Sequence, residues 1–295
     1  MPEIQDQAPY WYVQGLLNAG QWEAAKDYAE EEIENYTSKV TQGKFSLCVS
    51  LVRAGFGSAD GRNREDRHAL GLVGLRGLAK LGQQKAVGQL MEQYQIQLED
   101  GGGFLLRWIQ GRRLLAAADK SKQPDDYRAA AAALQDALDA PDADNQVSTA
   151  AQCRYELAWC LYKTGQYEQA ARAYQQAVTG MKASDAASAA QAAWMAFASL
   201  QRLAEQQPRF RAAAIDSLRT LKRDFPDHAY ARRADYYINK LSRPGVSPEE
   251  TIADLERIKS DAAAYLSARY DICLLTHQLW RAAEGDDRAD FAGRV

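Results

Sequence analysis

The chain has 295 residues, a formal net charge of −3 and an apolar content of 46%. This apolar content is that of a folded protein and argues against general disorder. The weakly acidic balance gives no long-range attraction for nucleic acid or anionic lipid. The sequence contains 53 Ala but only 19 Val and Ile together, so strand-forming residues are scarce and helix formers fill most windows. We therefore expect an all-α protein.

Helical periodicity runs almost from end to end and is interrupted by short segments rich in Gly and Pro, where helices must end or begin. It predicts fourteen helices, at about 8–18, 21–36, 39–54, 64–81, 84–99, 104–119, 125–139, 148–163, 167–181, 186–206, 210–224, 229–241, 249–259 and 262–283. Because the connections are short, successive helices should form antiparallel pairs.

The clearest repeated pair covers residues 151–184, with the sequence AQCRYELAWCLYKTGQYEQAARAYQQAVTGMKAS. Gly165 makes the turn between its two helices. The small residues Ala158 and Ala170 should let the helix backbones approach, and Leu157 and Tyr174 should fill the space beside them.

This spacing resembles the 34-residue tetratricopeptide repeat. Looser copies fit residues 8–36, 192–226 and 227–259, whereas residues 38–140 keep the hairpin rhythm without the signature. The resemblance implies a right-handed α-solenoid of stacked helical hairpins over residues 1–295. The stretch Asp224–Ala231, followed by Ala234 and Tyr237, is also similar to the inter-repeat junction of bacterial envelope tetratricopeptide proteins.

In tetratricopeptide proteins the first helix of each pair lines a concave face that holds partner peptides. In the clearest repeat this face should carry Gln152, Tyr155, Glu156, Trp159, Tyr162 and Lys163. The corresponding residues elsewhere are Tyr10, Trp11, Gln14 and Asn18 in the first repeat and Tyr236 and Tyr237 in the fourth. Aromatic rings with a polar group are frequent interface anchors. The alternative is that some of these rings pack between adjacent hairpins.

Other candidate sites have simpler interpretations. The cysteines Cys48, Cys153, Cys160 and Cys273 lack paired metal-ligand spacing, so we expect four small core residues and no metal. The three histidines fall on different hairpins, without the spacing of a catalytic triad. The basic cluster Arg62, Arg64, Arg67 and His68 is interpreted as a solvated helix face. We expect neither an enzyme nor a cofactor.

The leading hypothesis is therefore a scaffold or adaptor that binds a protein or peptide partner, without nucleic acid and without a membrane span. The alternative is a structural tetratricopeptide module of a larger bacterial envelope or multidomain protein that packs on its own flanking domains. The compartment would be the cytoplasm for the chain as it stands and the periplasm if a signal had been removed.

The first helix is apolar around most of its circumference, from Tyr10 to Val13 and again at Leu16 and Leu17. We expect another domain, the partner or a second copy of the chain to cover it, so self-association through the N-terminal hairpin is predicted as one outcome.

Overall fold

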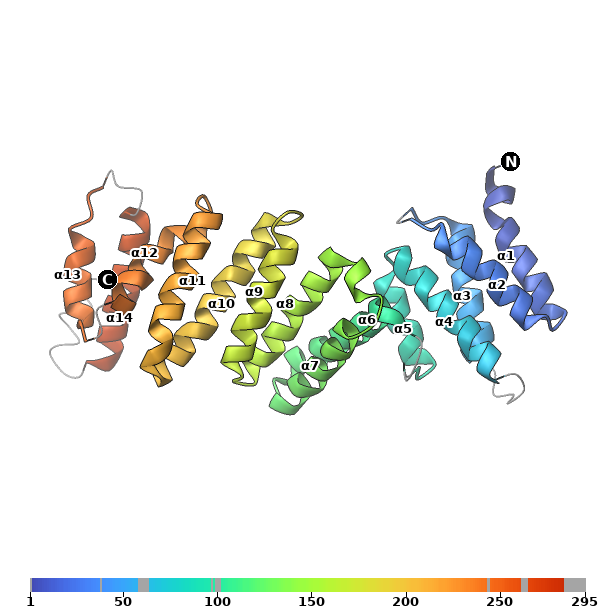
Figure 1. The fold of residues 1–295 in the computed structure, drawn as a ribbon, viewed down its shortest axis with the longest axis horizontal. Helices are drawn as coiled ribbons and strands as arrows, with labels where there is room; N and C mark the ends of the chain where they lie inside the picture. Colours follow the sequence, from blue (N-terminus) through green and yellow to red (C-terminus); the bar gives the residue numbers. More distant parts are fainter. Residues whose placement is uncertain are drawn as a thin grey trace. The chain divides into compact units, whose positions relative to one another are not determined.

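The computed structural model describes residues 2–37, 39–57, 64–96, 98, 102–242, 245–260 and 265–283 (Figure 1). None of these residues lies in a β-strand, so the described part of the chain is all-α. Its α-helices are α1 (Pro2–Asn18), α2 (Trp22–Glu34), α3 (Gln42–Phe56), α4 (Arg64–Lys80), α5 (Gln84–Gln93), α6 (Gly103–Ser121), α7 (Pro124–Leu138), α8 (Val147–Lys163), α9 (Tyr167–Met181), α10 (Ala186–Gln206), α11 (Arg211–Asp224), α12 (Ala229–Ser242), α13 (Pro248–Glu256) and α14 (Tyr265–Ala282).

The helices form two compact units, Met1–Cys160 and Leu161–Val295, and the boundary falls within α8. In the first unit α3 packs on α4, α6 packs on α7, and α1 contacts both α2 and α3. In the second unit α9 packs on α10, α10 on α11 and α11 on α12, and α13 packs on α14. The prediction of fourteen helices that pack in sequential pairs is confirmed for the described residues.

Local signals explain most helix ends. Gly20, Gly82 and Gly165 follow α1, α4 and α8 with positive φ angles, which glycine adopts without steric cost. Pro124 and Pro248 stand in the first turn of α7 and α13, where a missing N–H costs nothing. The bounds of α9 and α10 coincide with the predicted ranges.

The two largest differences from the predicted bounds lie at the start of α1 and the end of α5. Helix α1 begins at Pro2 rather than near residue 8, because Asp6 accepts hydrogen bonds from the Gly43 amide (2.8 Å) and the Thr41 hydroxyl and so ties the first turns to α3. Helix α5 ends at Gln93 rather than near residue 99. There Gln95 takes a positive φ of 49° and the Ile96 amide donates to the Met91 carbonyl, which closes the helix without a glycine.

Three of the four cysteines are buried, and burial raises the pKa of the Cys48, Cys153 and Cys160 thiols to about 12. The prediction for Cys273 is wrong, since this residue lies on an exposed side of α14. The pattern of α14 does not reveal which side its neighbours cover.

The structure also differs from the prediction that the basic cluster around Arg67 forms a solvated helix face. Arg67 is buried, its Nε and Nη2 both donate to the Ala54 carbonyl at 3.2 Å, and its guanidinium lies over the Trp22 ring. It therefore satisfies a carbonyl in the last turn of α3 and is no solvated charge. Arg62 lies outside the described residues.

Candidate partner-binding surface

The sequence-predicted site residues occupy three helices, α1, α8 and α12. On α1 the rings of Tyr10 and Trp11 meet edge to face, with centroids 4.8 Å apart. Trp11 and Asn18 are exposed, whereas Tyr10 and Gln14 are half-buried. This group offers an open aromatic surface on the first unit.

On α8 the predicted stripe is present but partly engaged. Trp159 is half-buried, and its indole Nε1 donates to Asp119 Oδ1 at 3.3 Å, an oxygen that also accepts from the Tyr127 hydroxyl at 2.7 Å. Tyr155 is half-buried in the same unit. Beyond the unit boundary, Tyr162 contacts the Tyr167 ring with centroids 5.3 Å apart, and Lys163 is exposed. The hydrogen bond of Trp159 therefore supports the alternative that some of these rings pack within the protein.

Glu156 was expected on the same exposed face, and this expectation is wrong. It is buried and accepts hydrogen bonds from Trp108 Nε1 (2.8 Å) and Gln152 Nε2 (3.2 Å), and Arg112 Nε lies 3.1 Å from its Oε1. Burial raises the pKa of Glu156, although Arg112, Trp108 and Gln152 oppose the rise. Because the donors come from α6 and α8, this carboxylate holds the two helices together and is not available to a partner.

On α12 the predicted Tyr237 belongs to a larger assembly, the aromatic cluster, which consists of Trp194, Phe197, Tyr230 and Tyr237. The Trp194 ring stacks on Tyr230, with centroids 4.9 Å apart and planes 10° from parallel. It meets Tyr237 edge to face at 5.3 Å, and Phe197 touches both Trp194 (5.1 Å) and Tyr237 (5.2 Å). Offset and edge-to-face contacts of this kind favour one fixed arrangement of rings.

The cluster combines a buried base with partly exposed rings. Phe197 is fully buried on α10, whereas Trp194, Tyr230 and Tyr237 are half-buried. His228 lies beside Tyr230, with ring centroids 4.9 Å apart, and its Nδ1 accepts from the Tyr230 amide at 3.3 Å. The rings are thus held in place before any partner arrives, which lowers the entropy cost of binding.

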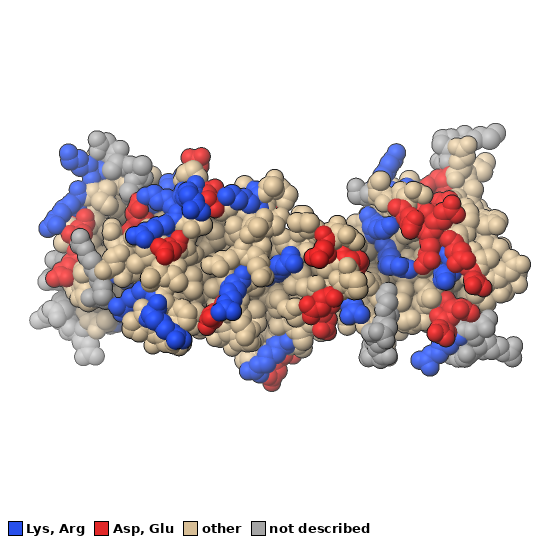
Figure 2. Space-filling view, in the orientation of Figure 1, with Lys and Arg blue, Asp and Glu red and all other residues tan. Residues whose placement is uncertain are grey.

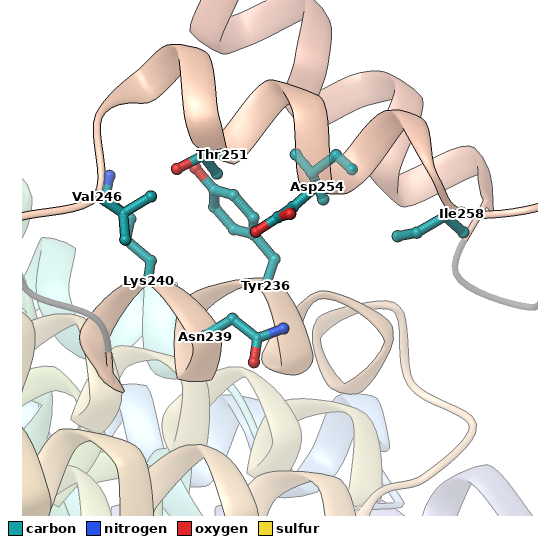
Figure 3. Close-up of a pocket in the computed structure, with 8 residues that line it drawn as sticks. Tyr236, Asn239, Lys240, Val246, Thr251, Asp254 and Ile258 are labelled. Atoms are coloured by element: carbon teal, nitrogen blue, oxygen red, sulfur yellow. The ribbon is translucent and has the colours of Figure 1, made fainter.

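The neighbouring Tyr236 projects from α12 into a cleft between α12 and α13 (Figure 3). The cleft has a volume of about 310 Å³, and its apolar lining residues are Val246, Leu255 and Ile258. Its polar lining residues are Tyr236, Asn239, Lys240, Thr251 and Asp254. Figure 3 shows the Tyr236 ring between Thr251 and Asp254. The cleft is large enough for one side chain of a partner.

Burial, assisted by the negative charge of Asp271, raises the pKa of Tyr236 to about 12 and also raises the pKa of Tyr237. Both phenols therefore keep their protons at neutral pH and can donate hydrogen bonds. Asp271 itself is buried on α14, and burial raises its pKa, although Arg233 and Lys240 oppose the rise.

A second hollow, of about 520 Å³, lies where α9, α10 and α11 meet. Ala193 and Ala196 of α10 line it together with Val178 and Thr179 of α9, and Asp216 and Asp224 stand on the α11 side. It contains no aromatic ring. Interface anchors are usually large aromatic or Arg side chains, so the aromatic cluster is the stronger candidate.

Among the described residues, no group of His, Cys, Asp and Glu has the arrangement of a metal site. No helix in that part of the chain is long and apolar enough to cross a bilayer. No family model matches this chain, and neither the curated proteins nor the solved structures contain a match to it.

Trp194 falls within the predicted repeat at residues 192–226, but neither Trp194 nor Tyr230 was among the predicted partner-binding residues. The signal for Trp194 was present, since it follows Trp159 by about one repeat length. Tyr230 stands at the start of α12, and only the packing of α12 near α10 shows that it stacks on Trp194.

Proposed function

We propose that this chain is a protein-interaction scaffold or adaptor that binds a protein or peptide in the groove of a tetratricopeptide-like helical array. The observation that carries this proposal is the aromatic cluster. Its half-buried Trp and Tyr rings form a fixed apolar surface with phenol hydroxyls, the chemistry of interface hot spots.

Two observations in the predicted repeat at residues 151–184 support this proposal. Gly165 has a positive φ of 79°, and Ala158, Ala170 and Tyr174 are fully buried. Counting helices onward from α8 and α9, the first helices of the next pairs are α10 and α12. These are the helices that carry the aromatic cluster and the predicted Tyr236 and Tyr237.

The alternative is a structural module that packs on flanking domains of a larger protein. The exposed Trp11 and Tyr12 of α1 favour it, since large apolar groups at the end of a helical array are normally covered. In that case the isolated chain would bind no short peptide through the aromatic cluster.

Selection from a displayed random peptide library on the immobilised chain tests the proposal. Peptides recovered and then synthesised should bind the unmodified chain, and Trp194→Ala or Tyr230→Ala should each weaken binding by at least about tenfold, the effect of removing an interface anchor. Val147→Ala, which trims an exposed apolar residue of α8, is the matched control and should leave binding unchanged.

Helix content and melting temperature of each variant separate loss of the surface from loss of the fold. Normal binding by folded Trp194→Ala and Tyr230→Ala variants would contradict the assignment to the cluster. If the triple variant of Tyr155, Trp159 and Tyr162 to Ala abolished binding instead, the surface would lie on α8.

A further inference from the structure

His228 stands directly before α12 and caps the start of that helix. Its Nδ1 accepts a hydrogen bond from the Tyr230 amide at 3.3 Å. This amide lies in the first turn of the helix, where no helical carbonyl is available to it. A backbone amide can only donate, so Nδ1 carries no proton in this arrangement and the imidazole is neutral. The cap therefore exists in one charge state of His228.

The cap is joined to the aromatic cluster through Tyr230. The rings of His228 and Tyr230 lie with centroids 4.9 Å apart, and Tyr230 stacks on Trp194 at 4.9 Å. Trp194 in turn contacts Phe197 and Tyr237. His228 thus holds Tyr230 at two points, the amide and the ring. A change in His228 therefore acts on the partner-binding surface through a single intervening residue.

Protonation of His228 is incompatible with this cap. A proton on Nδ1 turns the acceptor into a donor, so two N–H groups would face each other, and the new positive charge would lie at the positive end of the α12 dipole. His228 is half-buried, so its ring can turn into solvent and leave the Tyr230 amide uncapped. Attraction between an imidazolium and the Tyr230 ring opposes this movement, but it is weaker than the lost cap and the dipole repulsion together.

The helices that pack against α12 supply no compensating negative charge. These helices are α10, α11 and α14. On α10 the charged residues, Arg202 and Glu205, stand in the last two turns and pair with each other at 3.3 Å. On α14 the charge of the buried Asp271 is offset by Arg233 and Lys240.

The surroundings of His228 at the end of α11 and the start of α12 are positive on balance. Figure 2 shows basic side chains gathered in this region. In residues 222–235 the basic residues are Lys222, Arg223, Arg232 and Arg233, and the acidic ones are Asp224, Asp227 and Asp235. Asp224 is held by Lys182 of α9 at 3.1 Å and by Arg223 at 3.0 Å. Asp227 is exposed, so solvent screens its attraction for an imidazolium.

We propose that His228 is a pH-sensitive cap that regulates the aromatic cluster. Neutral His228 holds Tyr230 against Trp194, and its protonation releases Tyr230 and weakens partner binding. This regulation rests on the proposed function, because it acts on the surface assigned to the partner. Imidazoles ordinarily take up a proton near about pH 6.5, so mild acidification is the signal.

An NMR titration between about pH 7.5 and about pH 5 tests the cap without any partner. The ring current of Trp194 shifts the ring protons of Tyr230, and this shift should decrease with the same midpoint as the titration of the His228 imidazole. His228→Asn supplies an amide oxygen that accepts at every pH, so the Tyr230 shift should then stay constant. His277→Asn, which replaces an exposed histidine of α14, is the control and should leave the titration of Tyr230 unchanged.

The peptides selected as described above test the effect on binding. They should bind the unmodified chain about fivefold more weakly at about pH 5.5 than at about pH 7.5, the equivalent of one lost cap. His228→Asn should bind equally at both values, and His277→Asn should keep the difference. His228→Ala, which lacks a cap at every pH, should bind weakly at both.

The two experiments separate failure of the cap from failure of the proposed function. Tyr230 protons that do not follow the His228 titration, or a pH difference in affinity that persists in His228→Asn, would overturn the cap, even if peptides bind through the cluster. If no peptide bound through the cluster at neutral pH, the proposed function would fail and with it the regulation of binding. The NMR titration would still show whether His228 controls the position of Tyr230.

Discussion

Asp271 illustrates how burial acts on a single residue of this protein. Its carboxylate is buried on α14, and its Oδ2 accepts no hydrogen bond. A buried carboxylate oxygen without a donor is costly when the group is ionised, and burial accordingly raises the pKa of Asp271 above the ordinary 3.8. The folded protein therefore holds the proton more tightly than the unfolded chain does.

The sign of the pH dependence follows from this raised pKa. The contribution of Asp271 to stability is fully present below about pH 4 and is lost as the pH rises through the folded pKa. Asp271→Asn removes the charge at constant size, so at pH 7 it should stabilise the protein by about 1 kcal/mol. Below about pH 4 it should have little effect.

Urea unfolding at the two pH values measures this difference. Asp235→Asn is the control, since Asp235 is exposed and paired with Lys222 at 2.7 Å, and such pairs contribute little. A destabilised Asp271→Asn at pH 7 would mean that attraction to Arg233 and Lys240 outweighs the cost of burial.

At the scale of the helix, α4 packs closely on its neighbours because glycines line one side of it. A Cβ added at Gly74 would lie 2.5 Å from the Cys48 carbonyl oxygen, and one at Gly77 would lie 2.5 Å from the Cys48 sulfur. Leu51 and Leu75, from α3 and α4, are fully buried in the same unit. Glycine at these positions allows α3 and α4 to approach closely, even though glycine weakens an isolated helix.

Replacing two helical glycines by alanine should therefore have opposite effects. Gly74→Ala should cost about 1–3 kcal/mol, because the obstructing atom belongs to the backbone of α3 and cannot turn away. Gly15→Ala has open space around it and should stabilise α1 by roughly 0.5–1 kcal/mol through helix propensity. Denaturant midpoints for the two variants measure the difference, and equal midpoints would contradict the close packing of α3 on α4.

This glycine packing also explains how far the sequence could predict the fold. The positions of Gly and Pro between the helical segments were sufficient to predict the number of helices and most of their bounds. Residues 38–140 lack the repeat signature, and within this range α4 packs closely through glycines, whereas the residues at 151–184 with the signature include buried alanines. The start of α1 depends on the hydrogen bond between Asp6 and α3, and the end of α5 depends on the left-handed conformation of Gln95. Neither feature can be recognised from the neighbouring residues in the sequence.

The candidate site was predictable only in part, because the sequence does not show which helix covers which face. Helical spacing identifies which residues share a face, as for Tyr155 and Trp159, but not which face a neighbouring helix covers. Glu156 is covered by α6, and Cys273 is left open on α14. The stacking of Trp194 on Tyr230 joins α10 and α12, so it could be known only from the structure.

At the scale of the whole molecule, contacts run mainly between helices that are neighbours in the sequence. Each of the two units is held together by consecutive pairs and by a few contacts that skip one helix, such as α1 with α3 and α10 with α12. In an array with such short-range contacts, stability is a sum of local terms, and damage in one region need not unfold another.

Two matched substitutions test this locality. Leu75 on α4 and Leu218 on α11 are both fully buried, so Leu75→Ala and Leu218→Ala should each cost about 2–5 kcal/mol. Hydrogen exchange should then speed up for α3 and α4 in the first variant and for α10 to α12 in the second, with amides of the other unit unchanged. The reason is that a cavity in one unit removes none of the packing that protects the other. Equal loss of protection in both units from either substitution would show that the chain unfolds as one cooperative body, and nearest-neighbour packing would then fail to describe its stability.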